Sequence, residues 1–198
     1  VWMGEILFRT KLSENLFKGL SPWLQKMPGG LIHVNVVGCA LFAAISGSSA
    51  ATVATVGKMS IPELRKRNYP EKILLGSLAG SGTLGLLIPP SIILIIYGVA
   101  VQESIAKLFI AGIIPGIMIA LIFMSYVIIW SLINKKEMPK ILEEFSFLEK
   151  IRRSKQLLPV ILLITAVIGS IYTGIATATE AASLGVVGAL ILSFFQKS

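Results

Sequence analysis

The sequence predicts an all-α integral membrane protein that contains a re-entrant helical hairpin followed by a broken transmembrane helix. Of its 198 residues, 55% are hydrophobic and only 14% are charged, a balance typical of membrane proteins. Uncharged runs long enough to cross a ~30 Å hydrocarbon core occur at residues 73–101, 108–134 and 156–179. Most Lys and Arg residues behind the formal charge of +8 lie in loops between apolar runs, so the charge does not indicate a nucleic-acid partner.

Residues 1–29 are expected to hold the end of a preceding span and then an amphipathic helix at the membrane interface. The opening VWMGEILF is typical of the tail of an apolar helix, and no signal peptide is visible. The chain is therefore expected to be an internal piece of a longer protein. Between Arg9 and Lys26, leucines alternate with charged residues, as in interfacial helices. A solvated connector would explain this alternation equally well.

The longest uncharged stretch, from Met27 to Gly57, exceeds the length of one membrane-crossing helix. Its 31 residues would span roughly 46 Å at about 1.5 Å per residue. The glycine and serines at 46–49 disfavour a helix in the middle of this stretch. We therefore predict a re-entrant hairpin over residues 30–61, with arms at about 30–46 and 50–61 and both ends at the same membrane face.

The predicted hairpin tip carries chemistry without a charged side chain. One arm ends there with free backbone carbonyls and the other begins with free amides, so partial charges of both signs meet. The hydroxyls of Ser48, Ser49 and Thr52 add further polar groups. Irregular backbone at membrane depth is tolerated where protein covers it or where it lines a wet cavity. The tip therefore predicts a site for a cation and a carboxylate.

Residues 69–101 are predicted to form a transmembrane helix that is broken near its middle. Three glycines within 80–85 and the pair Pro89-Pro90 divide the run into halves of about 69–79 and 90–101. Pro90 suits the first turn of the second half, whose free amides Ser91 is expected to cap. A kinked helix that packs through its small residues is the alternative. Because this second interrupted segment follows directly on a hairpin, a transporter binding site is favoured.

Residues 102–175 are expected to form two further spans, joined by a basic loop at 134–155. The loops 58–72 and 134–155 hold 12 of the 18 Lys and Arg, and the positive-inside rule places both in the cytoplasm. The hairpin would then enter the membrane from the cytoplasmic side. Near the end of the chain, Thr179 and Glu180 are expected to cap the last helix at the outer interface rather than to form a site.

Three alternatives to a transporter remain open. An intramembrane serine hydrolase would use Ser48 or Ser49 with His33, but the helical rise puts His33 about 20 Å from the tip. A non-transporting membrane assembly subunit would use the small residues for helix packing alone. A selective channel would be built around the same loop. Cys39 is the only cysteine, so an internal disulfide and a cysteine-based metal cluster are excluded.

Four motifs of this chain together resemble one family. They are SGSSAAT at 46–52, PELRKRNYPEK at 62–72, GSLAGSGTLGLLIPPS at 76–91 and GIATATEAAS at 174–183. They are similar in order and spacing to the large membrane subunit of tripartite ATP-independent periplasmic (TRAP) transporters, the DctM-like permeases. That family commonly has TPTEAA where this chain has Thr177-Ala178-Thr179-Glu180. The missing proline concerns a turn and not the hairpin.

This resemblance implies the permease subunit of a sodium-coupled secondary importer for organic acids, of C4-dicarboxylate or sugar-acid type, and not an enzyme. It implies an inverted repeat with an elevator motion, in which residues 30–101 are a transport-domain element and 176–198 start the second half. It further implies a multi-pass protein of the bacterial inner membrane, with a small TRAP membrane subunit and a periplasmic solute-binding protein as partners. No cofactor is implied beyond Na⁺ as the coupling ion.

Carried over onto this sequence, the resemblance implies that the hairpin tip faces the helix break and that oxygens from both clasp one sodium ion. The site residues of the tip are Ser46, Gly47, Ser48, Ser49 and Thr52, and those of the break are Gly82, Thr83, Gly85, Ile88, Pro89 and Ser91. Of these residues, the expected sodium ligands are Ser48, Ser49, Thr83 and Gly85.

Overall fold

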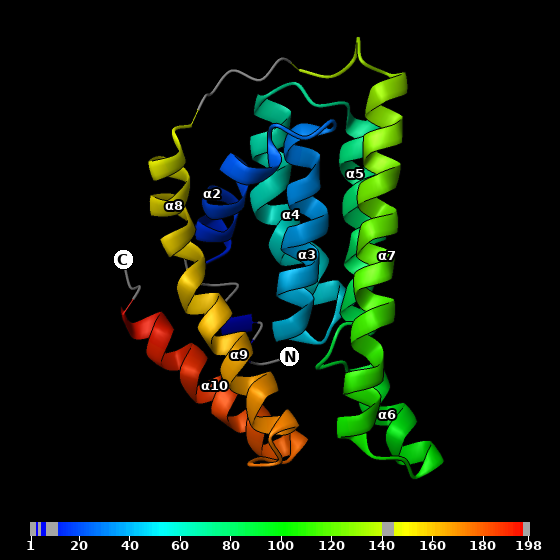
Figure 1. Cartoon of the computed structure of the whole chain (residues 1–198), viewed down its shortest axis with the longest axis vertical. Helices are drawn as coiled ribbons and strands as arrows, with labels where there is room; N and C mark the ends of the chain where they lie inside the picture. Colours follow the sequence, from blue (N-terminus) through cyan, green and yellow to red (C-terminus); the bar gives the residue numbers. More distant parts are fainter. Residues whose placement is uncertain (1–2, 4, 7–11, 140–144, 196–198) are drawn as a thin grey trace.

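The computed structural model describes residues 3, 5–6, 12–139 and 145–195, which form helices and short turns with no strand among them (Figure 1). This confirms the predicted all-α class. The helices are α2 (Leu12–Leu24), α3 (His33–Ser46), α4 (Ser49–Lys66), α5 (Glu71–Gly82), α6 (Ile92–Val101), α7 (Ile105–Ile133), α8 (Phe147–Ser154), α9 (Leu158–Tyr172) and α10 (Ala178–Phe195). Short 3-10 turns lie at η1 (Gly30–Ile32), η2 (Thr83–Leu86) and η3 (Lys155–Leu157).

α3 and α4 form a helical hairpin, and α5 packs against both of them (Figure 1). Phe42 of α3, Val56 of α4 and Leu74 of α5 are buried in one apolar core. Burial of these side chains, rather than local helix propensity, therefore holds the three helices together. The turn between α3 and α4 lies partway along the neighbouring α7, and both outer ends of the hairpin point to the same end of the molecule (Figure 1).

The second arm of the hairpin is longer than the sequence predicts. α4 continues to Lys66, beyond the expected end at Ile61 and past Pro62. The side chain of Leu64 is fully buried in the core. Tertiary packing therefore extends the helix, although Pro62 lacks an N–H for the helical hydrogen-bond ladder.

α5 begins at Glu71 rather than at the predicted Tyr69. Tyr69 precedes Pro70, and a residue before proline is disfavoured in helical conformation. The Tyr69 hydroxyl instead accepts a hydrogen bond of 3.0 Å from the backbone N–H of Leu31. This bond ties the α4–α5 connection to the start of the hairpin.

Among the residues that the structure describes, two helical stretches are long and apolar enough to cross a membrane: α7, and the run Phe147–Tyr172 that contains α8, η3 and α9. The 29 residues of α7 correspond to about 44 Å at 1.5 Å per residue. α7 runs past both the hairpin and the broken helix (Figure 1). Many of its apolar side chains are exposed, among them Ile114 and Ile133, which is typical of a helix that faces lipid.

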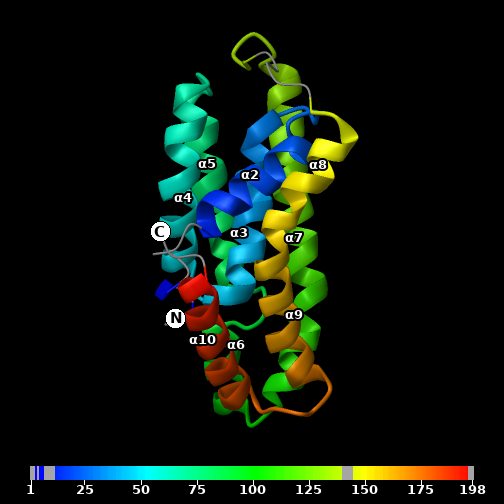
Figure 2. The same cartoon turned by 90° about the vertical axis from the view of Figure 1, so that its left-hand side faces the viewer.

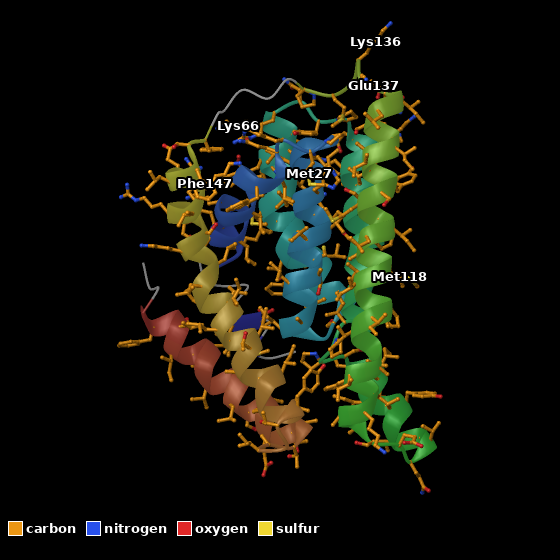
Figure 3. The ribbon with its side chains drawn as sticks, viewed as in Figure 1. Met27, Lys66, Met118, Lys136, Glu137 and Phe147 are labelled. Carbon is orange, nitrogen blue, oxygen red and sulfur yellow. The ribbon has the colours of Figure 1, made fainter. Side chains whose placement is uncertain are left out.

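The two basic loops lie at one end of the molecule. Lys66, at the end of α4, and Lys136, after α7, lie near the same end (Figure 3). The α6–α7 and α9–α10 connections lie at the opposite end (Figure 1). An alternation of basic and weakly charged loops along the chain predicts this arrangement.

α2 is amphipathic, and its apolar face packs against the rest of the protein. Leu16, Phe17 and Leu20 are buried, and a Cβ added to Gly19 would lie 2.6 Å from the side chain of Leu157. Both views place α2 beside α8 (Figures 1 and 2). α2 is therefore a packed element of the fold rather than a solvated connector.

The cap of α10 differs in one residue from the prediction. The Glu180 carboxylate accepts hydrogen bonds of 2.8 Å from both the backbone N–H and the hydroxyl of Thr177. The Thr177 hydroxyl in turn faces the Glu180 N–H at 3.4 Å, which is a capping box with Thr177 at its start. The predicted cap with Thr179 is therefore wrong, because Thr179 already lies inside the first turn of α10.

Candidate functional site: the hairpin tip in the helix break

The hairpin turns at Gly47 and Ser48, within the segment where the sequence predicts the tip. Gly47 has a left-handed backbone with φ of 60°, and its N–H donates to the Ala43 carbonyl at 3.0 Å, which ends α3. A Cβ at Gly47 would lie 2.5 Å from the backbone oxygen of Pro90. Both the left-handed conformation and this approach therefore require glycine. Ser48 then caps α4 by accepting a bond of 3.4 Å from the Ala51 N–H.

The hydroxyls of Ser46 and Thr52 are used within the tip. They lie 2.8 Å apart, and both residues are buried. The Ser46 hydroxyl also accepts from the Ser48 N–H at 3.3 Å and donates to the Ser48 carbonyl at 3.2 Å. These two predicted site residues therefore stabilise the turn, because each satisfies polar groups that water does not reach.

The tip sits against both halves of the broken helix. On the α5 side, a Cβ at Gly85 would lie 2.8 Å from the backbone nitrogen of Ser49, and a Cβ at Gly82 would overlap Val53 of α4. On the α6 side, the Gly47 carbonyl accepts a hydrogen bond of 3.4 Å from the Ile92 N–H. The structure thus brings together the two segments that face each other according to the family resemblance.

The break itself differs from the prediction at its second end. α6 begins at Ile92, after a cis peptide bond between Pro89 and Pro90, so Pro90 lies before the helix and not in its first turn. Ser91 precedes α6 without capping it through its side chain. The Ser91 hydroxyl instead donates to the carbonyl of Leu86, which closes the irregular segment onto η2.

α7 approaches the break closely through two glycines. A Cβ at Gly112 would lie 3.1 Å from the carbonyl oxygen of Leu87, and a Cβ at Gly116 would lie 2.9 Å from the side chain of Ile88. The predicted site residue Ile88 therefore packs towards α7. Small residues four positions apart allow such close backbone contact between membrane helices.

The hydroxyl of Ser49 is buried and has no hydrogen-bond partner among the described residues. Such a group costs free energy unless a ligand or a water molecule satisfies it. The Thr83 hydroxyl differs, because it lies at an exposed residue and donates to the Gly80 carbonyl at 2.7 Å. Of the expected sodium ligands, Ser48, Ser49 and Gly85 therefore meet at the contact, whereas the Thr83 side chain bonds to its own helix.

A pocket of about 310 Å³ lies beside the tip. Its lining includes Ser46 and Gly47 of the tip, Ile92 of α6, Val167 of α9 and Ser183 of α10. None of the described residues that line it is charged. Polar contacts in this pocket therefore come from hydroxyl and backbone groups.

His33 lies at the start of α3, and its Nε2 is 2.7 Å from the Pro28 carbonyl. The 14 residues of α3 separate it from the tip by about 20 Å. His33 is therefore too far from Ser48 and Ser49 to act as a base. In the described part of the chain, no group of three or more His, Cys, Asp or Glu residues is placed to hold a metal ion.

Asn35 joins the hairpin to α5 and is not among the site residues that the sequence predicts. Its side chain is fully buried and donates to the Leu74 carbonyl at 3.2 Å and to the Ser77 hydroxyl at 3.0 Å. Ser81, one turn further along α5, donates to the Asn35 carbonyl at 3.3 Å. An asparagine inside an uncharged apolar run was the available indication, since a buried amide needs partners on a neighbouring helix.

The whole chain, residues 1–198, matches the family model described as the DctM component of the tripartite ATP-independent periplasmic transporter. It is 40% identical over 84% of its length to the C4-dicarboxylate TRAP transporter large permease protein DctM of Pseudomonas aeruginosa, covering 38% of that protein. The corresponding protein of Rhodobacter capsulatus is 38% identical over 97% of the chain, which covers 46% of it. A sialic acid TRAP transporter large permease protein of Vibrio cholerae is 34% identical over 97% of the chain. The chain thus spans less than half the length of these relatives, covering 44% of the last.

Proposed function

The chain belongs to the DctM component family of the tripartite ATP-independent periplasmic transporters, and from this premise we propose that it forms part of the permease subunit of a sodium-coupled importer of organic acids. Its relatives are transporter permeases and not enzymes, which removes the serine hydrolase as an alternative. In this proposal the α3–α4 hairpin is re-entrant, enters from the cytoplasmic side and belongs to a transport domain that moves in an elevator mechanism.

One observation supports the proposed ion site most directly: at the contact between tip and break, the hydroxyl of Ser49 has no hydrogen-bond partner among the residues that the structure describes. Residues 46–52 and 82–91 contain no Asp, Glu, His, Lys, Arg, Cys or Tyr, so they offer no titratable group for a proton relay. They do offer hydroxyl and carbonyl oxygens at the ends of two interrupted helices. Such neutral oxygen ligands suit a hard cation, and the carbonyl ends of half-helices favour positive charge.

The proposed substrate is an organic acid, because the named substrates of the relatives include C4-dicarboxylates and sialic acid. The N-termini of α4 and α6 both lie at the tip–break contact. Free amides at helix N-termini bind carboxylates without a charged side chain. The uncharged pocket beside the tip is consistent with this kind of recognition.

The proposed partners are a small TRAP membrane subunit and a periplasmic solute-binding protein that delivers the acid. The proposed location is the bacterial inner membrane, with the basic loops 58–72 and 134–155 in the cytoplasm. The segment from α10 onwards is proposed to start the second half of an inverted repeat, which would contribute a second hairpin.

The test is uptake of a radiolabelled organic acid by the complete permease, reconstituted with its small subunit and binding protein. We expect uptake to follow an imposed sodium gradient and to persist when the proton gradient is collapsed at fixed membrane potential. Ser49→Ala should raise the sodium concentration for half-maximal uptake by about three- to tenfold, the loss of one neutral ligand. Ser125→Ala, at an exposed position of α7, is the matched control and should leave it unchanged.

Uptake that follows a pH gradient in sodium-free buffer would refute the proposed coupling. A complete complex that binds its partners but moves no acid under any gradient would instead support a non-transporting assembly subunit. Equal fluxes in both directions without coupling would indicate a channel.

A further inference from the structure

α8 exposes an apolar stripe next to a membrane-crossing helix. Phe147 is 67% exposed, Leu148 79% and Ile151 45%, and Phe147 lies at the start of α8, towards the end of the molecule that holds the basic loops (Figure 3). The stripe continues into α9 with exposed Leu158 and Leu162. Apolar side chains gathered on one helix face mark a surface that contacts lipid or a partner.

The length of the adjoining helix places α8 at the level of the lipid headgroups. η3 and α9 run from Lys155 to Tyr172 and cover about 27 Å at 1.5 Å per residue, close to the ~30 Å hydrocarbon core. Trp23 of α2 lies against α8, with its Nε1 donating to the Ser154 hydroxyl at 2.8 Å and its ring 6.4 Å from that of Phe147. Half-exposed tryptophans are typical of the membrane–water interface.

Four basic residues lie in or directly after α8: Lys150, Arg152, Arg153 and Lys155. Lys150 Nζ lies 5.4 Å from the Trp23 ring centroid, and the Arg153 guanidinium lies 4.2 Å from that of Phe145. Within the residues that the structure describes, no carboxylate forms an ion pair with these four side chains. The carboxylate of Glu149 instead accepts a hydrogen bond of 3.0 Å from the Ser146 N–H.

We propose that the surface shared by α2 and α8 binds the headgroups of anionic phospholipids. We call it the α2–α8 surface; it is formed by Trp23, Phe147, Leu148, Lys150, Ile151, Arg152, Arg153 and Lys155. The cations supply charge complementarity to lipid phosphates, since a basic segment at a membrane surface attracts anionic lipid. The apolar stripe enters the acyl-chain boundary beside them, which a soluble phosphate cannot exploit. The surface is independent of the hairpin tip and of any coupling ion.

The test measures lipid selectivity of the permease subunit reconstituted in phosphatidylcholine bilayers, using spin-labelled phosphatidylglycerol and spin-labelled phosphatidylcholine. Electron paramagnetic resonance reports the motionally restricted fraction of each lipid on the protein. The site variant carries Lys150→Gln, Arg152→Gln, Arg153→Gln and Lys155→Gln. The control variant removes the same charge from exposed residues in the basic loops at the same end, with Lys66→Gln, Lys72→Gln, Lys135→Gln and Lys136→Gln.

We expect the site variant to lose about threefold or more of its preference for phosphatidylglycerol, while the control variant keeps most of it. The restricted fraction of phosphatidylcholine should stay the same in both variants, which shows that each is folded. If both variants lost the preference for phosphatidylglycerol equally, net charge alone would explain the binding and the proposed site would be overturned. An unchanged preference in the site variant would also overturn it. Displacement of phosphatidylglycerol by inorganic phosphate at matched ionic strength would assign the site to a free anion and also overturn the proposal.

Discussion

The carbonyl oxygen of Gly47 accepts a hydrogen bond from the backbone N–H of Ile92 at an N···O distance of 3.4 Å. This contact joins the tip of the hairpin to the first residue of α6. On the other side of the tip, the backbone of Ser49 lies against Gly85, beyond the end of α5. The tip therefore bridges the two halves of the broken helix, and changes at its glycines are expected to affect both halves.

Alanine at Gly47 or Gly85 should destabilise the protein and reduce uptake. At Gly47 the methyl group would meet the Pro90 carbonyl at 2.5 Å with a left-handed backbone, and at Gly85 it would meet backbone atoms of Ser48 and Ser49 at 2.8–3.0 Å. Strain against backbone atoms costs roughly 1–3 kcal/mol per site. Thermal unfolding in detergent and uptake by the complete transporter measure the two effects.

The matched control for these variants is Gly76→Ala. Gly76 lies inside α5, and a Cβ there would meet nothing within 4 Å. This variant should be as stable as the parent or slightly more stable, because alanine favours a helix over glycine by up to about 1 kcal/mol. If Gly85→Ala unfolded at the same temperature as Gly76→Ala, the close contact between tip and break would be contradicted.

Ser46→Ala should lower the folding stability in sodium-free buffer, whereas Ser49→Ala should not. Ser46 contacts Thr52 and both backbone groups of Ser48, so its loss should cost about 1–3 kcal/mol of folding stability. The Ser49 hydroxyl has no partner among the described residues, so its loss should not lower the unfolding temperature in sodium-free buffer. Thermal unfolding with and without sodium compares the two variants. A large destabilisation by Ser49→Ala without sodium would show that the hydroxyl is structural.

Asn35→Ala should destabilise the packing of α3 on α5 by about 1–3 kcal/mol, because the Leu74 carbonyl and the Ser77 hydroxyl would lose a buried donor. Asn134→Ala is the control, since Asn134 makes one comparable bond, of 2.9 Å to the Trp130 carbonyl, at the end of α7. Chemical denaturation in detergent micelles measures the free energy of unfolding of the two variants. Equal stability of the two variants would show that the buried amide of Asn35 contributes no more to folding stability than the amide of Asn134 at the end of α7.

Cysteines placed in the loops should report the orientation in the membrane. Lys136→Cys lies in a basic loop and Glu103→Cys in the α6–α7 connection, and both positions are exposed. With the basic end inside, an impermeant thiol reagent added to intact cells should label position 103 and not position 136. The native Cys39 is buried and should give little background. Labelling of position 136 from outside would reverse the topology.

The positions of the turn and the break follow from the sequence because hydrocarbon tolerates so few interruptions. The uncharged run around Ser46–Ser49 exceeds one membrane thickness, and the prolines after Gly85 cannot continue a helix. Both features are properties of local residues. The structure accordingly places the turn at Gly47 and Ser48 and the irregular segment between η2 and α6.

The remaining details depend on contacts between distant segments, which local pattern does not reveal. α4 extends past Pro62 because Leu64 is buried by other helices. The Ser46 hydroxyl makes its hydrogen bonds within the turn, whereas the Ser49 hydroxyl, three residues later, has no partner in the part of the chain that the structure describes. The sequence places both serines among the expected site residues of the tip, and local pattern does not reveal which hydroxyl is used in the turn. The role of Asn35 is hidden from local pattern for the same reason, since its partners lie about 40 residues further along the chain.

Gly112 and Gly116 of α7 affect how well the backbone at the helix break is shielded from lipid. Where the helix is interrupted after Leu87, peptide groups lose their helical partners, and hydrocarbon supplies no substitutes. Because Gly112 and Gly116 carry no side chains, the α7 backbone lies close against Leu87 and Ile88 at the break. Alanine at either position would hold α7 away from the break, so the shielding of these peptide groups from lipid depends on two absent methyl groups.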